Sequence, residues 1–401
     1  MNRTTTPIPA PSTPAPRRAR GLSLVELMIA LVLGLLVTAG LIQLFGTAKL
    51  TFLTADASAR VQENGRFTME LLKRDLRMAG THGFCAARLE INNHLDPACG
   101  GGVSDFFDPN RAVLGWEYDG TGINDAFTLP DDLDPAGTSP SEWTSTADQG
   151  SLPGVLDGRV VPGSDVLVVR TMQVNTGIQG DPNNLNSPNC TGNSSIGLQG
   201  SHGLPDDAIV LVTNCATGAD LFQNRSNANA STFAAGSGSC SNPGPGNVNG
   251  IDWATCYDDS MQVFEINAMA YYVGLNPDTG DPGLYRFNLT TGTGGSAAGA
   301  EELVQGVESM QVLYGFSAAA PAGDGQSISQ WLRADQVPAD GWGQVIALRL
   351  SVSVRSPENA DGDVTPMTFE LSGANIQTPG DGRLRQSFST TVALRNRLIV
   401  I

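Results

Sequence analysis

The stretch that decides the fold lies near the N-terminus. It reads Arg17-Arg18-Ala19-Arg20-Gly21-Leu22-Ser23-Leu24-Val25-Glu26, and none of the 22 residues that follow, 27–48, is charged. As a helix these residues would be about 33 Å long, which matches the roughly 30 Å hydrocarbon core of a bilayer. Basic residues before such a segment keep that end in the cytoplasm. The sequence therefore predicts one membrane-spanning helix, with the bulk of the chain on the far side of the membrane.

The unusual residue of this stretch is Glu26. A charged side chain inside a membrane helix costs on the order of 2.5–3.5 kcal/mol, so we expect it to have a partner. If the chain is cut between Gly21 and Leu22, the new amino group of Leu22 lies one helical turn from Glu26, on the same face. The helix macrodipole also favours a carboxylate at this end. The amine and the carboxylate can then neutralise each other, within one chain or between neighbouring chains.

A basic leader, a glycine and an apolar stretch with Glu at its fifth position resemble the class III signal of type IV pilins and pseudopilins. The resemblance implies cleavage after Gly21 by a prepilin peptidase and methylation of the Leu22 amine. The family usually has Phe as its first mature residue, so Leu22 is a departure. Two other interpretations stay open, a plain membrane anchor and a secretory signal cut at Gly46-Thr47-Ala48. Ordinary secretory signals, however, have apolar cores of only about 7–15 residues.

Length and charge bound the rest of the chain. The 401 residues can form one large or two modest domains. The leader, residues 1–21, holds four of the 23 Lys and Arg residues and no acidic one, which leaves 19 basic against 40 acidic residues, a net charge of −21. Such a surface disfavours nucleic acid and anionic membrane as partners. The 47 Gly and 24 Pro residues indicate loops around β-structure.

Six cysteines lie beyond the membrane segment, and an even number in an exported domain is typical of disulfides. They are Cys85, Cys99, Cys190, Cys215, Cys240 and Cys256. Pairing of sequence neighbours predicts the bonds Cys85–Cys99, Cys190–Cys215 and Cys240–Cys256, although six cysteines allow about 15 connectivities. Loops of this size would each stabilise the fold by roughly 3 kcal/mol.

The membrane helix is predicted to continue as an amphipathic helix over residues 49–80. Residues 49–79 contain no proline, and Asp56–Arg60 and Glu70–Arg74 are acid-before-base pairs four residues apart. Gly80 is a suitable stop. The apolar stripe at helical spacing is Leu50, Leu53, Ala57, Val61, Phe67, Leu71, Leu72 and Leu76. We therefore expect one helix of about 55 residues, half in lipid (22–48) and half packed on a globular domain.

Residues 81–401 are predicted to form a β-rich domain, because alternating or apolar runs are bounded there by turn residues. The expected strands are residues 165–172, 208–214, 262–273, 283–289, 304–316, 345–355 and 385–397. Low-complexity insertions near residues 174–206, 223–250 and 290–300 interrupt them and are expected to be surface loops. The predicted fold class is α+β, a pilin-like long helix packed on an antiparallel β-sheet domain with long, disulfide-stapled loops.

Several later segments are similar to the type IV pilus assembly protein PilW family. They are Gln62-Glu63-Asn64-Gly65-Arg66-Phe67, Arg74-Asp75-Leu76-Arg77-Met78-Ala79-Gly80, Val166-Leu167-Val168-Val169-Arg170, Gly306-Val307-Glu308-Ser309-Met310-Gln311-Val312-Leu313-Tyr314-Gly315, Val354-Arg355-Ser356 and Val392-Ala393-Leu394-Arg395-Asn396-Arg397. The resemblance runs from Gly21 almost to the C-terminus, without the insertions. It implies a large minor pilin that helps to initiate pilus assembly with other minor pilins.

The sequence shows no catalytic motif, neither a Gly-x-Ser-x-Gly turn nor a Walker loop nor a His-Glu-x-x-His helix, so we expect neither an enzyme nor a bound cofactor. Three weaker alternatives stay open. His82, Cys85, His94 and Cys99 could bind zinc, although oxidation of the two cysteines is favoured. Carboxylates near 278–281 and 359–363 could bind calcium, although they fit solvated turns better. Trp331 and Trp342 could contact a ligand, although packing is the simpler role.

The predicted function is that of a non-enzymatic minor pilin. It would lie in the inner membrane with its N-terminus in the cytoplasm and its C-terminal domain in the periplasm. After assembly it would lie in the pilus, with the tip as one position open to it. The expected partners are other minor pilins, the major pilin, the prepilin peptidase, the inner-membrane assembly platform and the lipid bilayer. Two alternatives are a large minor pseudopilin of type II secretion and, in another class, a pilus-tip adhesin or surface-binding module.

Overall fold

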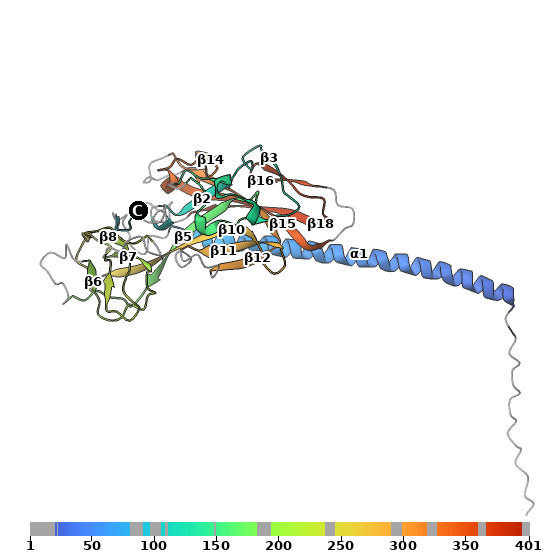
Figure 1. Cartoon of the computed structure of the whole chain (residues 1–401), viewed down its shortest axis with the longest axis horizontal. Helices are drawn as coiled ribbons and strands as arrows, with labels where there is room; N and C mark the ends of the chain where they lie inside the picture. Colours follow the sequence, from blue (N-terminus) through green and yellow to red (C-terminus); the bar gives the residue numbers. More distant parts are fainter. Residues whose placement is uncertain are drawn as a thin grey trace, which may run out of the picture. The chain divides into compact units, whose positions relative to one another are not determined.

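The computed structural model describes residues 21, 23–80, 91–96, 106–108, 111–147, 150–182, 194–236, 245–289, 299–318, 327–359 and 366–394. The chain divides into two units, Met1–Leu53 and Thr54–Ile401. The described part of the first unit is the N-terminal portion of helix α1. The second unit contains the remainder of α1 and every described strand (Figure 1).

Helix α1 runs from Leu24 to Arg77, and its 54 residues confirm the predicted long helix. Ser23 caps its N-terminus, because the Ser23 hydroxyl oxygen accepts the Glu26 N–H at 3.2 Å. Gly80 follows the C-terminus in the left-handed conformation, with φ +66°, and its N–H donates to the Arg170 carbonyl at 3.0 Å. A residue without Cβ takes this conformation at no steric cost, which is why the helix ends there.

The part of α1 in the second unit buries one face against the β-structure. The buried residues are Ala57, Val61, Gly65, Thr68, Met69, Leu72 and Leu76, which follow the spacing of one helical stripe. Leu50 and Phe67 were predicted in this stripe, but each is 55% exposed. Phe67 follows the buried Gly65 by two residues, about 200° around the helix, so it faces away from the core. Gly65 and Thr68 take places on the buried face that the apolar pattern did not mark.

The largest sheet has nine strands, in the order β1-β8-β7-β10-β5-β2-β4, with β11 paired to β10 and β12 paired to β11. Their bounds are β1 Ile91–Asn93, β2 Val113–Tyr118, β4 Trp143–Thr144, β5 Val166–Asn175, β7 Ile209–Thr213, β8 Ala219–Gln223, β10 Gln262–Leu275, β11 Pro282–Asn288 and β12 Ala300–Gln305. One edge of β10 pairs with β5, whereas its other edge pairs first with β7 and then with β11. The pairs are antiparallel apart from β1 with β8.

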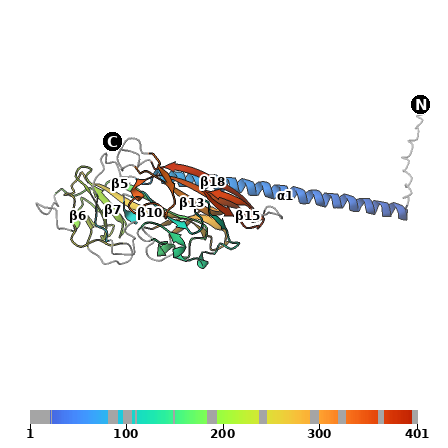
Figure 2. The same ribbon diagram turned by 90° about the horizontal axis from the view of Figure 1, so that it is seen from above.

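A second sheet has four antiparallel strands in the order β14-β13-β15-β18, and the last three lie side by side in Figure 2. Their bounds are β13 Val307–Phe316, β14 Gln330–Leu332, β15 Val345–Asn359 and β18 Arg383–Ala393. Two smaller sheets consist of β16 Thr368–Leu371, β17 Ala374–Gln377 and β3 Ala126–Thr128, and of β6 Ser195–Gly197 with β9 Thr232–Ala234. Short 3-10 helices occupy Pro135–Gly137, Pro140–Glu142, Gly154–Leu156 and Trp342–Gln344.

Gly306 divides a segment that the sequence predicted as one strand over residues 304–316. Gly306 has φ +87°, and a Cβ there would lie 2.6 Å from the Arg355 carbonyl oxygen. The chain therefore turns at this glycine and passes from β12, which pairs with β11, to β13, which pairs with β15. The N–H of Gly306 donates to the Pro282 carbonyl, and its own carbonyl accepts the Arg355 N–H, each at 2.7 Å. A single residue thus joins the two main sheets.

The insertions contain more than the surface loops expected of them. The residues described there include β6 and β9, and they contribute to a second hydrophobic cluster separate from the main core. This second cluster consists of Ile196, Leu198, Leu204, Ala208, Val210, Val212, Phe222, Phe233, Ala235, Ile251, Trp253, Tyr257, Met261 and Val263. Strand β7 serves both cores, because Ile209 and Leu211 face the main cluster while Val210 and Val212 face the second. Composition hid this core, because its few large side chains are dispersed among Gly, Asn and Ser.

Gly65 provides a test of the packing between α1 and the four-stranded sheet. A Cβ at Gly65 would lie 2.0 Å from the ring of Phe388. We expect Gly65→Ala to destabilise the detergent-solubilised protein by about 1–3 kcal/mol through overpacking, despite the gain in helix propensity. Thermal unfolding measures the effect. Phe388→Leu in the same chain should restore part of the loss. Gly40→Ala is the matched control, because a Cβ at Gly40 meets no atom within 4 Å, and a loss there would contradict the steric explanation.

Candidate assembly site

The N-terminal portion of α1 exposes a continuous apolar surface. Every residue from Leu24 to Phe52 is exposed, and its large apolar side chains expose from 48% (Leu41) to 75% (Leu24) of their area. By length and composition α1 is the one described helix that could cross a membrane, and none of its most apolar window is buried. This surface therefore needs lipid or other helices around it.

The polar side chains of this segment bond within the helix itself. The hydroxyl groups of Thr38, Thr47 and Thr51 donate to the carbonyl oxygens four residues earlier, at 2.8, 2.9 and 2.9 Å. Backbone and side-chain polar groups in lipid must be satisfied in this way, since no water is available. A Cβ at Gly34, Gly40 or Gly46 would meet no atom of the described residues within 4 Å. The described part of the fold therefore gives no steric reason for these three glycines.

Glu26 lies in the first turn of α1, three residues after the capping Ser23, and it is the only charged residue from Gly21 to Ala48. Its carboxylate is therefore close to the positive end of the helix macrodipole, as predicted. Gly21 is exposed. Leu22 lies outside the described residues, so the proposed contact between its amino group and Glu26 stays a prediction. The sequence signal that we missed is Ser23-x-x-Glu26, the signature of a capping box.

Polar contacts fix the second half of α1 to the globular unit. The amide of Asn64 donates to the Gln305 carbonyl at 3.0 Å. The Tyr271 hydroxyl donates to Asp75 at 2.6 Å, and Arg286 lies 3.9 Å from the same carboxylate. Burial raises the pKa of Tyr271, and the hydrogen bond to Asp75 raises that pKa further. The position and rotation of the helix are thus set by hydrogen bonds between α1 and the strands β10 and β12, as well as by apolar packing.

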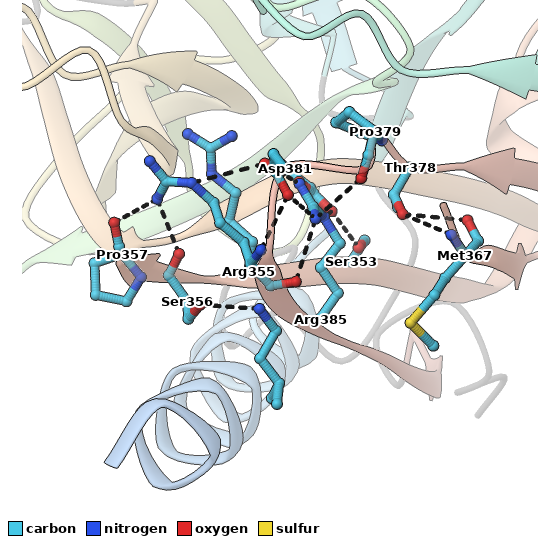
Figure 3. A network of polar contacts seen from close by, with 12 residues as sticks. Ser353, Arg355, Ser356, Pro357, Met367, Thr378, Pro379, Asp381 and Arg385 are labelled. Carbon is cyan, nitrogen blue, oxygen red and sulfur yellow. Dashed lines mark hydrogen bonds and ion pairs between the residues drawn. The ribbon is translucent and has the colours of Figure 1, made fainter. Parts of the chain in front are cut away.

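A buried network of charges joins β13, β15 and β18 (Figure 3). Glu308 and Arg385, each with a side chain only 1% exposed, form an ion pair at 2.9 Å, and the Ser353 hydroxyl donates to Glu308 at 2.8 Å. Both terminal nitrogens of the Arg385 guanidinium also donate hydrogen bonds to the Asp381 carboxylate, at 2.5 and 2.8 Å. Burial would raise the pKa of Asp381, but the hydrogen bonds from Arg385 and the Arg383 N–H lower it below its usual value.

A buried pair of acids, Glu117 and Asp165, lies where β2 meets β5 and β13. Asp165 is fully buried and accepts the N–H groups of Tyr118 at 3.0 Å and Val312 at 2.8 Å. Glu117 is 4% exposed, and Arg333 approaches it only to 4.0 Å. Burial raises the pKa of the Glu117 carboxyl, and the nearby charge of Asp165 raises it further. Glu117 is consequently protonated at neutral pH, which removes the cost of a second buried negative charge.

The structure also places several residues that the sequence singled out. His94 is 2.6 Å from Asp220 through its Nε2, while His82, Cys85 and Cys99 lie outside the described residues. Asp281 forms ion pairs with Arg355 and Arg383 at 3.4 and 3.5 Å, so its carboxylate has two partners within the chain. No group of three potential metal ligands occurs among the residues that the structure describes. Asp361 and Asp363 lie outside them.

Of the six cysteines, the structure describes Cys215 and Cys256, and each is disulfide-bonded. Cys190 and Cys240, like Cys85 and Cys99, lie outside the described residues, so the predicted connectivity stays a prediction. Trp342 is buried, packs edge-on against Tyr314 and donates to the Thr146 hydroxyl at 3.2 Å. The guanidinium of Arg349 lies over the ring of Trp331, with its Cζ atom 4.5 Å from the ring centre. Both tryptophans thus have packing partners within the chain.

Two family models match the chain at its two ends. Residues 16–42 match the prokaryotic N-terminal methylation motif, and residues 270–396 match the Type IV Pilus-assembly protein W family. The chain carries a PilW domain. This domain begins within β10 and extends through β18, so it contains the whole Glu308–Arg385 network. Together, the methylation motif and the PilW domain identify a PilW-like minor pilin of type IV pilus assembly, which associates with other pilins.

One solved structure similar to this PilW-like chain is the Type IV-like pilin TTHA1219 from Thermus thermophilus. The likeness covers 34% of this chain and 70% of that one, with 20% sequence identity and a TM-score of 0.22. No curated protein matches the chain.

The buried carboxyl of Glu117 predicts how the stability of the PilW-like chain changes with pH. Because the pKa of this acid is raised on folding, its contribution is complete below the unfolded value of 4.5 and is lost as pH rises towards the folded value. Glu117→Gln should therefore gain stability over the wild type above pH 4.5, by up to about 1.4 kcal/mol per pH unit. Thermal unfolding between pH 4 and pH 9 measures this difference.

Glu370→Gln is the matched control for this experiment, because Glu370 is an exposed acid of the same unit. Its stability difference from the wild type should show no comparable rise with pH. Equal pH profiles for Glu117→Gln and the wild type would contradict the assignment of a protonated carboxyl at Glu117.

Proposed function

We propose that this PilW-like minor pilin enters the pilus by lateral packing of α1 after cleavage between Gly21 and Leu22. The cut would be made by a prepilin peptidase, and the freed amine of Leu22 would be methylated. The protein would begin in the inner membrane, with its N-terminus in the cytoplasm and its globular unit in the periplasm. It would then join other minor pilins and the major pilin on the inner-membrane assembly platform, with a place at the pilus tip.

The observation that supports this proposal most is the exposed apolar portion of α1 with its single carboxylate in the first turn. Nothing in the described part of the chain covers this surface. A helix of this kind is stable in lipid and equally among similar helices, because both surroundings are apolar. Transfer from the membrane to a helical filament therefore changes its neighbours without exposing the helix to water.

Glu26 then supplies the specificity of that packing. A carboxylate in an apolar environment is stabilised by a nearby positive charge far more strongly than in water. The amine of Leu22 in a neighbouring pilin would provide this charge, and so would the amine of the same chain. Membrane insertion depends on the whole apolar surface, whereas docking depends on this pair. The two properties are therefore separable by mutation.

The first prediction concerns Glu26→Ala. We expect the variant to remain in the membrane at the wild-type level, while the number of pili per cell falls by roughly 100-fold. The amine of Leu22 would then have no carboxylate partner, and an unpaired buried charge costs about 2.5–3.5 kcal/mol. Membrane fractionation and electron microscopy measure the two quantities. Glu63→Ala is the matched control, an exposed acid farther along the same helix. Normal piliation in Glu26→Ala cells would refute the role given to this carboxylate.

The second prediction concerns the processed N-terminus. Mass spectrometry of the protein purified from pili should find Leu22 as the first residue, with its amine methylated. Gly21→Leu should leave the leader attached, because a large side chain then occupies the cleavage position, and this variant should be absent from pili. A mature protein that begins beyond residue 46 would instead indicate a secretory signal.

A further inference from the structure

The sheets of the globular unit differ in how their edges end. The described edge strands β1, β3, β4, β14 and β16 are only two to four residues long. Edge strand β12 has six residues, two of them the acids Glu301 and Glu302. Short length and charge are the usual means by which proteins protect a sheet edge from pairing with another chain. Strand β18 is the exception, because it has eleven residues and pairs with β15 on one side only.

Along the outer side of β18, a row of backbone groups has no partner among the residues that the structure describes. The N–H of Leu394 donates to the carbonyl of Ile346 in β15 at 2.8 Å, which fixes the direction of the amides before it. Since these directions alternate along an antiparallel strand, the N–H and C=O groups of Ser387, Ser389, Thr391 and Ala393 point away from β15. All four residues are exposed, and no described residue pairs with their outer side.

The side chains of this edge offer no protection. From Gln386 to Ala393 the strand contains no charged residue and no proline, and its exposed side chains are small or neutral. The whole chain, by contrast, has 40 acidic against 23 basic residues. An acidic partner would be repelled over most of this surface, but it could approach along this neutral strip without bringing like charges together.

The position of β18 connects this edge with the helix that assembles. Phe388 lies directly on Gly65 of α1, so the strand runs next to the part of the helix that belongs to the same unit. The edge of β18 therefore lies beside the part of α1 that belongs to the globular unit. A pilin whose helix packed along this part of α1 would bring its own globular domain near the sheet.

We propose that the free edge of β18 receives a β-strand from the globular domain of a different pilin, which becomes the fifth strand of this sheet. The proposal rests on the function proposed above, in that the partner arrives through helix packing. Recognition occurs mainly through main-chain hydrogen bonds to the four outward-facing residues. The occupant is an extended segment with small or β-branched neutral side chains, since these match the exposed face of β18.

The test uses the full-length protein in its own cells, with a photo-crosslinking amino acid in place of Thr391. The control carries the same amino acid in place of Gln330, an exposed residue of the three-residue edge strand β14. We expect crosslinks to another pilin to be at least tenfold more abundant from position 391 than from position 330. Mass spectrometry of the product identifies the partner and the crosslinked strand.

A pair of substitutions at the same position tests the role of the backbone. Thr391→Pro removes an outward N–H without removing a bond to β15, and it should reduce recovery of the partner pilin with this protein at least tenfold. Thr391→Val keeps the N–H and the shape, and it should leave recovery unchanged. Equal recovery with both variants would overturn the proposal. The amount of each variant in the membrane shows whether it has folded.

The outcomes separate this inference from the proposed function. Crosslinks from position 391 to a second copy of this chain alone would overturn the choice of partner. Absence of any crosslink in normally piliated cells, where Glu26→Ala still abolishes pili, would overturn only the pairing at β18. Normal piliation of Glu26→Ala cells would refute the proposed function even if the crosslink to another pilin were present.

Discussion

No described residue of this chain buries the apolar side chains of α1 between Leu24 and Phe52. Each large aliphatic side chain gains roughly 1.5–3 kcal/mol on leaving water, so the segment as a whole is committed to lipid or to other helices. The internal hydrogen bonds of Thr38, Thr47 and Thr51 suit both environments. The globular unit, in turn, has to hold the other half of the same helix firmly, because any force on the apolar part reaches it through α1.

The PilW domain meets that requirement with buried charge as well as with apolar packing. Replacing a buried ion pair by apolar residues is often neutral for stability, so the Glu308–Arg385 pair is better understood as a determinant of register. Glu308 belongs to β13 and Arg385 to β18, and Ser353 of β15, the strand between them, donates to Glu308. A slip of one residue in any of the three strands would leave a charge buried without its partner.

Much of this fold follows from local sequence patterns, and the exceptions have physical reasons. The alternation of Leu348, Leu350, Val352 and Val354 with polar residues predicted strand β15 and its buried face, and all four are fully buried. The face of β15 with Ser351 and Ser353 is buried too, because Ser372 and Glu308 cover it, and these residues are distant in sequence. Phe67 was assigned to the buried stripe since its own chemistry favours burial, but Gly65 has that place because Phe388 needs the room.

The candidate site was predictable to the extent that its signals are local. Glu26, the leader and the apolar run stand next to one another in the sequence, and the methylation motif matches the same residues, 16–42. Contacts such as Glu117 with Asp165 depend on the approach of β2 and β5, so no spacing along the chain reveals them. The second hydrophobic cluster was missed for a similar reason, since its members come from several separate short segments that only the fold brings together.

The four-stranded sheet has two very different sides, with eleven residues in β18 and three in β14 at the opposite edge. A sheet of this kind can be lengthened in one direction and is closed in the other. Strand addition that begins at β18 would therefore stop after one partner on this molecule, because the three residues of β14 give too little backbone for a second chain to pair at the opposite edge.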